Sequence, residues 1–268
     1  MKEIKTAELL LLQLDIMDSI HNFCKENNLR YFLYGGSLLG AIRHEGYIPW
    51  DDDIDIAMPR NSYEKFIRSF NGTYDYLVVS APELDINFYA TYANVYDTRT
   101  FLDEGTNGHQ GADIGIKIDI FPIDSVEDDL AKYRFDKHKV AVLNNIAYIK
   151  RYRLFHGGGW WQDLKLLAYK LRYVLHSACS MRSQVLDIAS KCSISETVYV
   201  DDIVQNYSHD TRFKRTAIDK LFLTKFEDRQ YFIPTGYDEI LKASYGDYMK
   251  LPPIEKRVPH HGFKAFWR

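Results

Sequence analysis

Apolar residues recur at helical spacing in the first segment of the chain. Residues 3–28 carry apolar side chains every three or four positions, at Leu9, Leu12, Ile16, Ile20 and Phe23. This spacing predicts one long amphipathic helix whose apolar stripe faces a core. The next apolar run, at residues 31–34, is short and aromatic and leads into two glycines. It predicts a strand that ends in a turn.

Alternation of apolar and other residues marks the predicted strands. The clearest one covers residues 114–121, where every second residue is isoleucine. Alternate side chains of a strand share a face, so Lys117 and Asp119 lie opposite the isoleucines. Residues 53–57 predict another strand, which Pro59 ends. Residues 86–95 and 98–102 predict the two strands of a hairpin.

Helical patterns dominate the second half of the chain. The segments 126–148, 163–192 and 237–244 predict helices, and residues 222–226 and 231–233 predict short strands. Helices and strands without regular βαβ alternation favour an α+β fold with a largely helical C-terminal half. We divide the chain into a catalytic core, residues 1–125, and a helical extension with a C-terminal segment that completes the substrate site, residues 126–268. We expect the two parts to form one continuous unit.

Composition excludes several classes of protein. The chain has 268 residues, of which 46% are hydrophobic and 26% charged, as is typical of soluble globular proteins. The net charge of −3 argues against a protein that binds nucleic acid through a broadly basic surface. The three cysteines form no C-x-x-C pair, so we expect neither a disulfide framework nor a cysteine zinc site. Without a predicted signal peptide or membrane span, we expect a cytoplasmic protein.

One basic segment stands out from this acidic average. Residues 150–184 contain seven lysines and arginines but one acidic residue, Asp163. The segment includes Trp160 and Trp161 and a leucine stripe at helical spacing. Such a helix is typical of peripheral contact with an anionic membrane or with the phosphates of a lipid-linked glycan. The alternative is an ordinary core-packed helix whose lysines and arginines face water.

Two aspartates of the strand at residues 53–57 indicate a metal site. Ile54 and Ile56 can face a core, which places Asp53 and Asp55 together on the other face. Two carboxylates without a nearby cation repel each other, and a divalent cation relieves the repulsion. Carboxylate oxygens suit Mg²⁺ or Mn²⁺. The alternative is a solvated acidic turn, and ligand and structural roles are equally open for the preceding aspartates at 51 and 52.

Asp119 and the turn at residues 35–37 extend this interpretation. A third carboxylate from a neighbouring strand would allow two metal ions about 4 Å apart, which clamp a phosphate. Asp119 could then deprotonate an attacking hydroxyl, although an isolated aspartate on a strand usually faces water. The glycines before Ser37 open a helix N-terminus, which favours an anion. By itself, such a glycine turn is more often a simple connection.

Three blocks of the sequence resemble the LicD family of phosphotransferases. The first and longest is YGGSLLGAIRHEGYIPWDDDIDI at residues 34–56, and the others are IFPID at 120–124 and YGDYMKLPP at 245–253. The resemblance implies a nucleotidyltransferase-like mixed sheet flanked by helices. It also implies transfer of phosphocholine, or a related phospho-alcohol, from CDP-choline or another CDP-alcohol to a hydroxyl of a cell-surface glycan, with release of CMP. Teichoic acid and lipopolysaccharide are the typical acceptors, in lipid-linked or polymer form.

The mechanism implied by this resemblance assigns roles to individual residues. Asp53, Asp55 and Asp119 would bind two ions of Mg²⁺ or Mn²⁺ and carry the catalysis. Nucleotide or substrate contacts are expected from Gly36, Ser37, Arg43, Trp50, Lys117, Lys256 and His260. Lys117 could instead pair with a carboxylate that binds metal. For the other residues of this second set after Ser37, a packing or surface role is the alternative. Some fukutin-type relatives carry a zinc-binding insertion, which we do not expect here because the cysteines do not cluster.

Two other functions stay open at this point. One is a true nucleotidyltransferase, which would attach a nucleoside monophosphate to a small acceptor and release pyrophosphate. The other is a non-catalytic module that binds a metal or a glycan through the same loop. We expect the protein to be cytoplasmic and to contact the inner face of a bacterial cell membrane peripherally.

Overall fold

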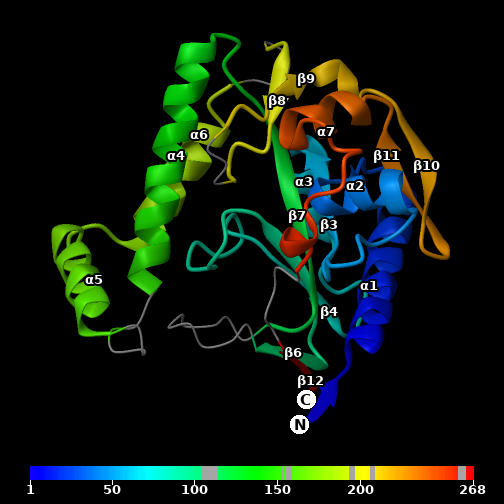
Figure 1. Ribbon diagram of the computed structural model, residues 1–268, viewed down its shortest axis with the longest axis horizontal. Helices are drawn as coiled ribbons and strands as arrows, with labels where there is room; N and C mark the ends of the chain where they lie inside the picture. The colour runs from blue at the N-terminus through cyan, green and yellow to red at the C-terminus, as the bar shows by residue number, and fades with distance from the viewer. Residues whose placement is uncertain (104–113, 152–153, 155–158, 193–196, 206–208, 259–263) are drawn as a thin grey trace.

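The computed structural model describes residues 1–103, 114–151, 154, 159–192, 197–205, 209–258 and 264–268. Its helices are α1 (Thr6–Glu26), α2 (Gly35–His44), α3 (Arg60–Ser69), α4 (Leu130–Arg151), α5 (Trp160–Arg172), α6 (Ala178–Ala189) and α7 (Tyr237–Tyr245), with short 3-10 helices η1 (Arg215–Ile218) and η2 (Ile254–Lys256). Its strands are β1 (Lys2–Ile4), β2 (Phe32–Leu33), β3 (Asp55–Pro59), β4 (Leu77–Ser80), β5 (Ala93–Asp97), β6 (Thr100–Asp103), β7 (Lys117–Ser125), β8 (Tyr199–Asp201), β9 (Phe213–Lys214), β10 (Leu221–Phe226), β11 (Arg229–Pro234) and β12 (Lys264–Trp267). This combination confirms the α+β class (Figure 1).

The central sheet has the strand order β2-β3-β7-β5-β4, and β8 and β9 extend it from one end of β7. β3 and β7 pair in parallel, whereas β5 and β7 are antiparallel. Helices α1, α2 and α3 contact these strands. At its start, β7 alternates the buried Ile118 and Ile120 with the half-buried Lys117 and Asp119, whereas the rest of the strand is buried on both faces. In β3, Asp55 is half-buried and the three residues that follow are buried.

A second, three-stranded sheet joins the two ends of the chain. Its order is β1-β12-β6, and Lys2 lies opposite Trp267 (Figure 1). The hairpin predicted for residues 86–95 and 98–102 is therefore wrong. β5 pairs with β4 and β7, while β6 pairs with β12. The partners of both strands come from distant parts of the sequence, which local alternation cannot reveal.

The helix predicted over residues 163–192 is two helices. α5 ends at Arg172 and α6 begins at Ala178, where the Ser177 side chain accepts a hydrogen bond from the backbone N–H of Ser180. An N-cap of this kind satisfies a donor that has no partner inside the helix, so it fixes where α6 starts.

Buried apolar residues form two clusters. The larger one lies between the central sheet and its helices. It also includes Phe213 of β9, Tyr231 of β11 and Ile240 of α7. The smaller one joins α4 and α6 through residues that include Val140 and Val185. The division of the chain at residue 125 stays a prediction.

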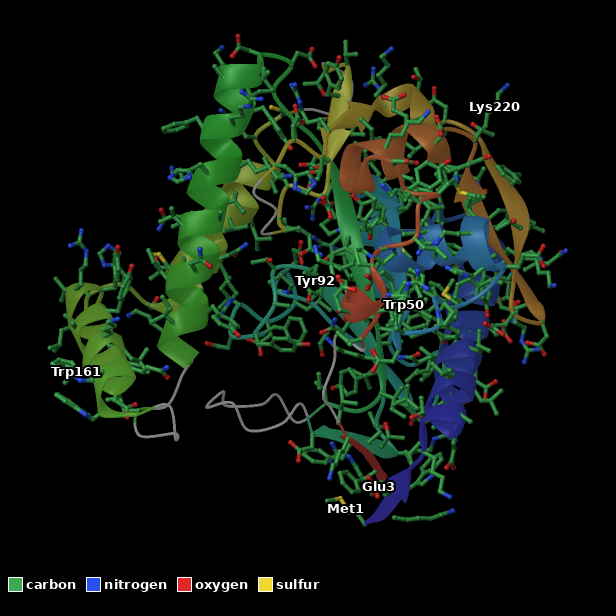
Figure 2. The ribbon with its side chains drawn as sticks, viewed as in Figure 1. Met1, Glu3, Trp50, Tyr92, Trp161 and Lys220 are labelled. Carbon is green, nitrogen blue, oxygen red and sulfur yellow. The ribbon has the colours of Figure 1, made fainter. Side chains whose placement is uncertain are left out.

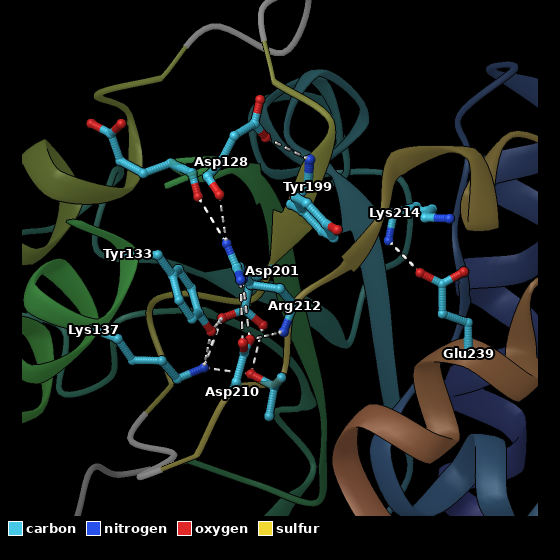
Figure 3. A network of polar contacts seen from close by, with 11 residues as sticks. Asp128, Tyr133, Lys137, Tyr199, Asp201, Asp210, Arg212, Lys214 and Glu239 are labelled. Carbon is cyan, nitrogen blue, oxygen red and sulfur yellow. Dashed lines mark hydrogen bonds and ion pairs between the residues drawn. The ribbon is translucent and has the colours of Figure 1, made fainter. Parts of the chain in front are cut away.

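A buried polar network ties α4 to β8 (Figure 3). Lys137 Nζ lies 2.7 Å from Asp201 Oδ2, and both residues are buried. The Tyr133 hydroxyl donates to the same oxygen at 2.7 Å, and the Thr211 hydroxyl donates to Asp201 Oδ1 at 2.8 Å. A buried carboxylate needs this degree of satisfaction, because an unpaired charge in the interior is strongly destabilising.

Candidate active site

Three polar side chains form a row across adjacent strands of the central sheet. In the parallel pair β3–β7, Asp55 lies opposite Asp119. In the antiparallel pair β7–β5, Asp119 lies opposite Asn94. Residues opposite one another share a face of the sheet and adjacent strands lie about 4.8 Å apart. The sequence predicts a third carboxylate from a neighbouring strand, and the structure places Asp119 there.

Negative charge accumulates around Asp55. Burial holds the pKa of its carboxyl well above the ordinary value. The charges of Asp53, Asp119 and Asp51 raise this pKa further, in that order. The Lys117 ammonium opposes them. Asp53 lies two residues before β3 rather than within it, but its charge still acts on Asp55. The loop and the two strands thus concentrate repelling carboxylates at one place.

This repulsion predicts a pH dependence of stability in protein freed of metal ions by a chelator. Above the ordinary pKa of 3.8, folded Asp55 keeps a proton that the unfolded chain releases. Because the folded state then binds more protons, its free energy of unfolding falls as the pH rises above about 4. Asp55→Asn removes this contribution, so its stability should fall less steeply. Urea unfolding of the wild type and of Asp55→Asn at several pH values tests this prediction. If the free energy of unfolding changed with pH in parallel for the two proteins, the prediction would be contradicted.

The N-terminus of α2 faces the same carboxylates. Gly35 has φ +53°, and a Cβ atom there would lie 3.2 Å from Asp55 Oδ2. A Cβ atom on Gly36 would lie 2.6 Å from Asp51 Oδ2, so the Asp51 carboxylate would have to move to make room for one. The two glycines therefore let the carboxylates approach the first turn of α2, where unpaired backbone N–H groups favour negative charge. Asp51 thus contacts the turn that was expected to cradle phosphates.

Ser37 holds the strand in place beside this turn. Its hydroxyl oxygen accepts a hydrogen bond of 2.8 Å from the backbone N–H of Asp55, and the side chain is buried. The backbone N–H of Tyr34 donates in turn to the carbonyl of Asp55 at 3.0 Å. Ser37 therefore positions Asp55 in the structure, and its contact with a nucleotide phosphate stays a prediction.

A ring of hydrogen bonds orients Asp119. Asn94 donates its side-chain N–H to Asp119 Oδ1, and Lys117 Nζ lies 3.1 Å from the same oxygen. Lys117 also donates to the Tyr89 hydroxyl at 3.1 Å, and that hydroxyl donates to Asn94 Oδ1 at 2.8 Å. Asn94 and Tyr89 are not among the site residues predicted from the sequence. Asn94 gave one usable signal, since it is a polar residue inside an apolar strand pattern.

The ring predicts a positioning role for Asn94. Asn94→Ala removes the donor that fixes Asp119, so we expect the kcat for transfer to fall by about 10- to 100-fold. KM should stay close to the wild-type value, because Asn94 is fully buried and does not reach a substrate. Steady-state kinetics separate the two parameters. A change in KM at unaltered kcat would show that Asn94 acts on binding instead.

The sequence block at residues 245–253 lies beside helix α2 and the acidic cluster. The Tyr245 hydroxyl lies 3.9 Å from the position that a Cβ atom would take on Gly35, and 45% of the residue's surface is exposed. Arg43 donates to the carbonyl of Tyr248 at 2.8 Å. These contacts bring the third resembling block of the sequence, residues 245–253, to the first. Tyr245 was not among the expected site residues, although it opens that block.

The other residues that were expected to contact the nucleotide or substrate lie in several different environments. Trp50 is half-buried, with the guanidinium of Arg257 5.6 Å from its ring centroid. Arg43 and Trp50 thus help to hold the C-terminal segment on α2, and burial lowers the pKa of Arg43. Lys256 is exposed in η2. His260 lies outside the described residues. Nucleotide contacts by these side chains stay predictions.

The donor set suits a hard divalent cation. Among the described residues, no three Asp, Glu, His or Cys side chains form a ready-made metal cage. Mg²⁺ does not need one, since it is usually held by one or two carboxylates together with water and substrate phosphates. Asp53, Asp55 and Asp119 supply such oxygens beside a helix N-terminus. The carboxylates and the α2 turn together form a site that fits a phosphate ester with its counter-ions.

Comparison with known proteins identifies a family match in the first half of the chain and a relative that is similar over its whole length. Residues 28–142 match the family described as LicD/FKTN/FKRP, nucleotidyltransferase domain. The chain is 31% identical to lipopolysaccharide cholinephosphotransferase LicD of Haemophilus influenzae over 272 residues, which cover 99% of both proteins. A stretch of 30 residues is 60% identical to ribitol 5-phosphate transferase FKRP of Homo sapiens, and it covers 11% of this chain and 6% of that protein.

These similarities define the chain as a phosphotransferase. Because the first of these relatives matches it from end to end, the chain belongs to the LicD family. The family resemblance read from the three sequence blocks is thereby confirmed. The matched region, residues 28–142, contains all three aspartates of the candidate site.

Proposed function

We propose that the protein transfers phosphocholine from CDP-choline to a hydroxyl of a cell-surface glycan and releases CMP. The observation that carries this proposal is the row of Asp55 and Asp119 on paired strands, with Asp53 beside it, at the N-terminus of α2. The similarity to a lipopolysaccharide cholinephosphotransferase supports phosphocholine as the group and lipopolysaccharide as the acceptor. Teichoic acid is the alternative acceptor.

The proposed reaction is an in-line displacement at the phosphorus that bears choline. The acceptor hydroxyl gives its proton to Asp119 as its oxygen bonds to that phosphorus. The bond between the phosphorus and the bridging oxygen breaks, and CMP leaves with the electron pair. Lys117, 3.1 Å from Asp119 Oδ1, and Asn94 keep the carboxylate oriented toward the attacking group.

Mg²⁺ or Mn²⁺ is the proposed cofactor. Asp53, Asp55 and Asp119 would hold one or two ions, which would neutralise the charge of the diphosphate when bound. Backbone N–H groups of the α2 turn would bind phosphate oxygens. This part of the proposal explains why the fold tolerates repelling carboxylates at a site where the pKa of Asp55 is raised.

A panel of donors tests the proposal. The protein is incubated with Mg²⁺, a lipid-linked glycan and either CDP-choline, CDP-ribitol or CDP-glycerol, and CMP release is measured. We expect release with CDP-choline that needs the glycan and stops on addition of EDTA. If CMP were released with CDP-ribitol and not with CDP-choline, the transferred group would be ribitol phosphate. A stable CDP-choline complex without CMP formation would favour a non-catalytic binding module.

Nucleotidyl transfer is the second candidate, since the matching family is described as a nucleotidyltransferase domain. It would leave a nucleotide on the acceptor and would release pyrophosphate from a nucleoside triphosphate. Incubation with CTP and the same glycan separates the two reactions. We expect no pyrophosphate.

A further inference from the structure

Helix α5 turns its apolar stripe away from the rest of the protein. No residue of α5 is buried. Trp160, Trp161 and Leu171 are each at least 60% exposed, and Leu164 is 50% exposed. The alternative of a core-packed helix is therefore wrong for this segment. The indole rings of the two tryptophans stack on each other with centroids 3.7 Å apart, and not on a core residue.

Helix α5 contacts the rest of the protein through one side, which faces α4. The helix packs on α4, and Lys170 Nζ donates to the carbonyl of Lys150 at 3.1 Å. Asp163, Leu166 and Tyr173 are half-buried on the same side. Figure 1 shows α5 at the periphery beside one end of α4, and Figure 2 shows Trp161 at the outer edge of the molecule. The exposed leucines and tryptophans thus form one outward face.

Positive charge accompanies this outward face. Lys165 and Arg172 are both exposed and lie seven positions apart, so they are two turns apart along one flank of the apolar stripe. The one acidic residue of the helix, Asp163, is on the half-buried side toward α4. An apolar face with tryptophans and a basic flank is the composition of a helix that lies in a membrane interface.

We propose that the outward face of α5 docks the protein on an anionic lipid bilayer. Trp160, Trp161, Leu164 and Leu171 enter the boundary between headgroups and acyl chains, and Lys165 and Arg172 contact anionic headgroups. A second copy of the chain fits less well, because a symmetric contact would bring like charges of the two flanks together. The proposal does not depend on the transfer chemistry, since its readout is vesicle binding.

Co-sedimentation with vesicles tests the proposal on the full chain. One set of vesicles contains phosphatidylcholine alone, and the other contains about one-third phosphatidylglycerol. We expect binding to the anionic vesicles only. K165Q/R172Q should lower the partition coefficient about 30-fold, since each basic residue near an anionic surface contributes about 1 kcal/mol. W161Q/L171Q should lower it at least as much.

The neighbouring helix α4 supplies matched controls. Lys132 and Lys139 are also exposed and seven positions apart, and Phe135 is 68% exposed. K132Q/K139Q and Phe135→Gln should bind vesicles like the wild type. Because α5 buries no side chain, its variants should also keep the wild-type melting temperature, which shows that they fold.

Three results would overturn the proposal. The first is no binding of the wild type to anionic vesicles, and the second is wild-type binding by both α5 variants. The third is a wild-type dimer that W161Q/L171Q converts to a monomer in size-exclusion chromatography with light scattering. That result would assign the face to a contact between copies of this chain.

Discussion

Asp119→Asn should lower the rate of phosphocholine transfer by at least about 10²- to 10³-fold, and Asp55→Asn should do the same. Both substitutions keep the size of the side chain and remove its negative charge. Asp55 and Asp119 lie opposite each other on paired strands, so each loss leaves the row without one of its charged oxygens. CMP release from CDP-choline in the presence of glycan measures the effect.

Stability measurements separate this loss from unfolding. An amide at position 55 needs no proton and bears no charge, so it avoids the cost that burial and the charges of Asp53 and Asp119 impose on this carboxyl. Asp55→Asn should therefore unfold at a higher urea concentration than the wild type in a chelator at neutral pH. Asp75→Asn, at an exposed position, should leave both activity and stability unchanged. Transfer at the wild-type rate by either site variant would remove that aspartate from the catalytic machinery.

Lys137→Met should lower the free energy of unfolding by about 3–5 kcal/mol. Lys137 is the cation beside buried Asp201, and Asp202 follows directly. Burial and the negative charge of Asp201 hold the pKa of Asp202 well above its ordinary value, and Lys137 opposes this shift. Without the ammonium group, two adjacent buried carboxyls lose their counter-charge, and the Tyr133 and Thr211 hydroxyls cannot replace it.

Urea unfolding of Lys137→Met and a matched variant measures this cost. Lys139→Met lies on the same helix at an exposed position, so it should change the unfolding free energy by less than about 0.5 kcal/mol. A loss below about 1 kcal/mol for Lys137→Met would show that water or a rearranged side chain compensates Asp201. The network would then not be what ties α4 to the central sheet.

The carboxylates of the site could be predicted from the sequence because their signals are local. Alternation in residues 53–57 and 114–121 predicts that Asp55 and Asp119 lie on the other face of their strands from the buried isoleucines. The structure has a strand in each region, β3 and β7. The pairing of those strands is not local. Only the fold shows that Asp55 and Asp119 share a register position in a parallel pair.

The missed residues depend on longer-range contacts. Asn94 reaches Asp119 because β5 pairs with β7, whereas local alternation favoured a hairpin with the strand that follows. Tyr245 reaches Gly35 from more than 200 positions away in the chain, and no periodicity predicts such a contact. The exposure of α5 could not be predicted from the sequence either, because a leucine stripe has the same periodicity whether it faces a core or a membrane.

Transfer from CDP-choline labelled with ³²P at the phosphorus next to choline tests the central claim most directly. With Mg²⁺ and a lipopolysaccharide acceptor, we expect the wild type to move the label to the glycan and to release unlabelled CMP. Asp119→Asn should transfer almost none. Unlabelled glycan with wild-type protein, or full labelling by Asp119→Asn, would contradict phosphocholine transfer by the Asp53, Asp55 and Asp119 site.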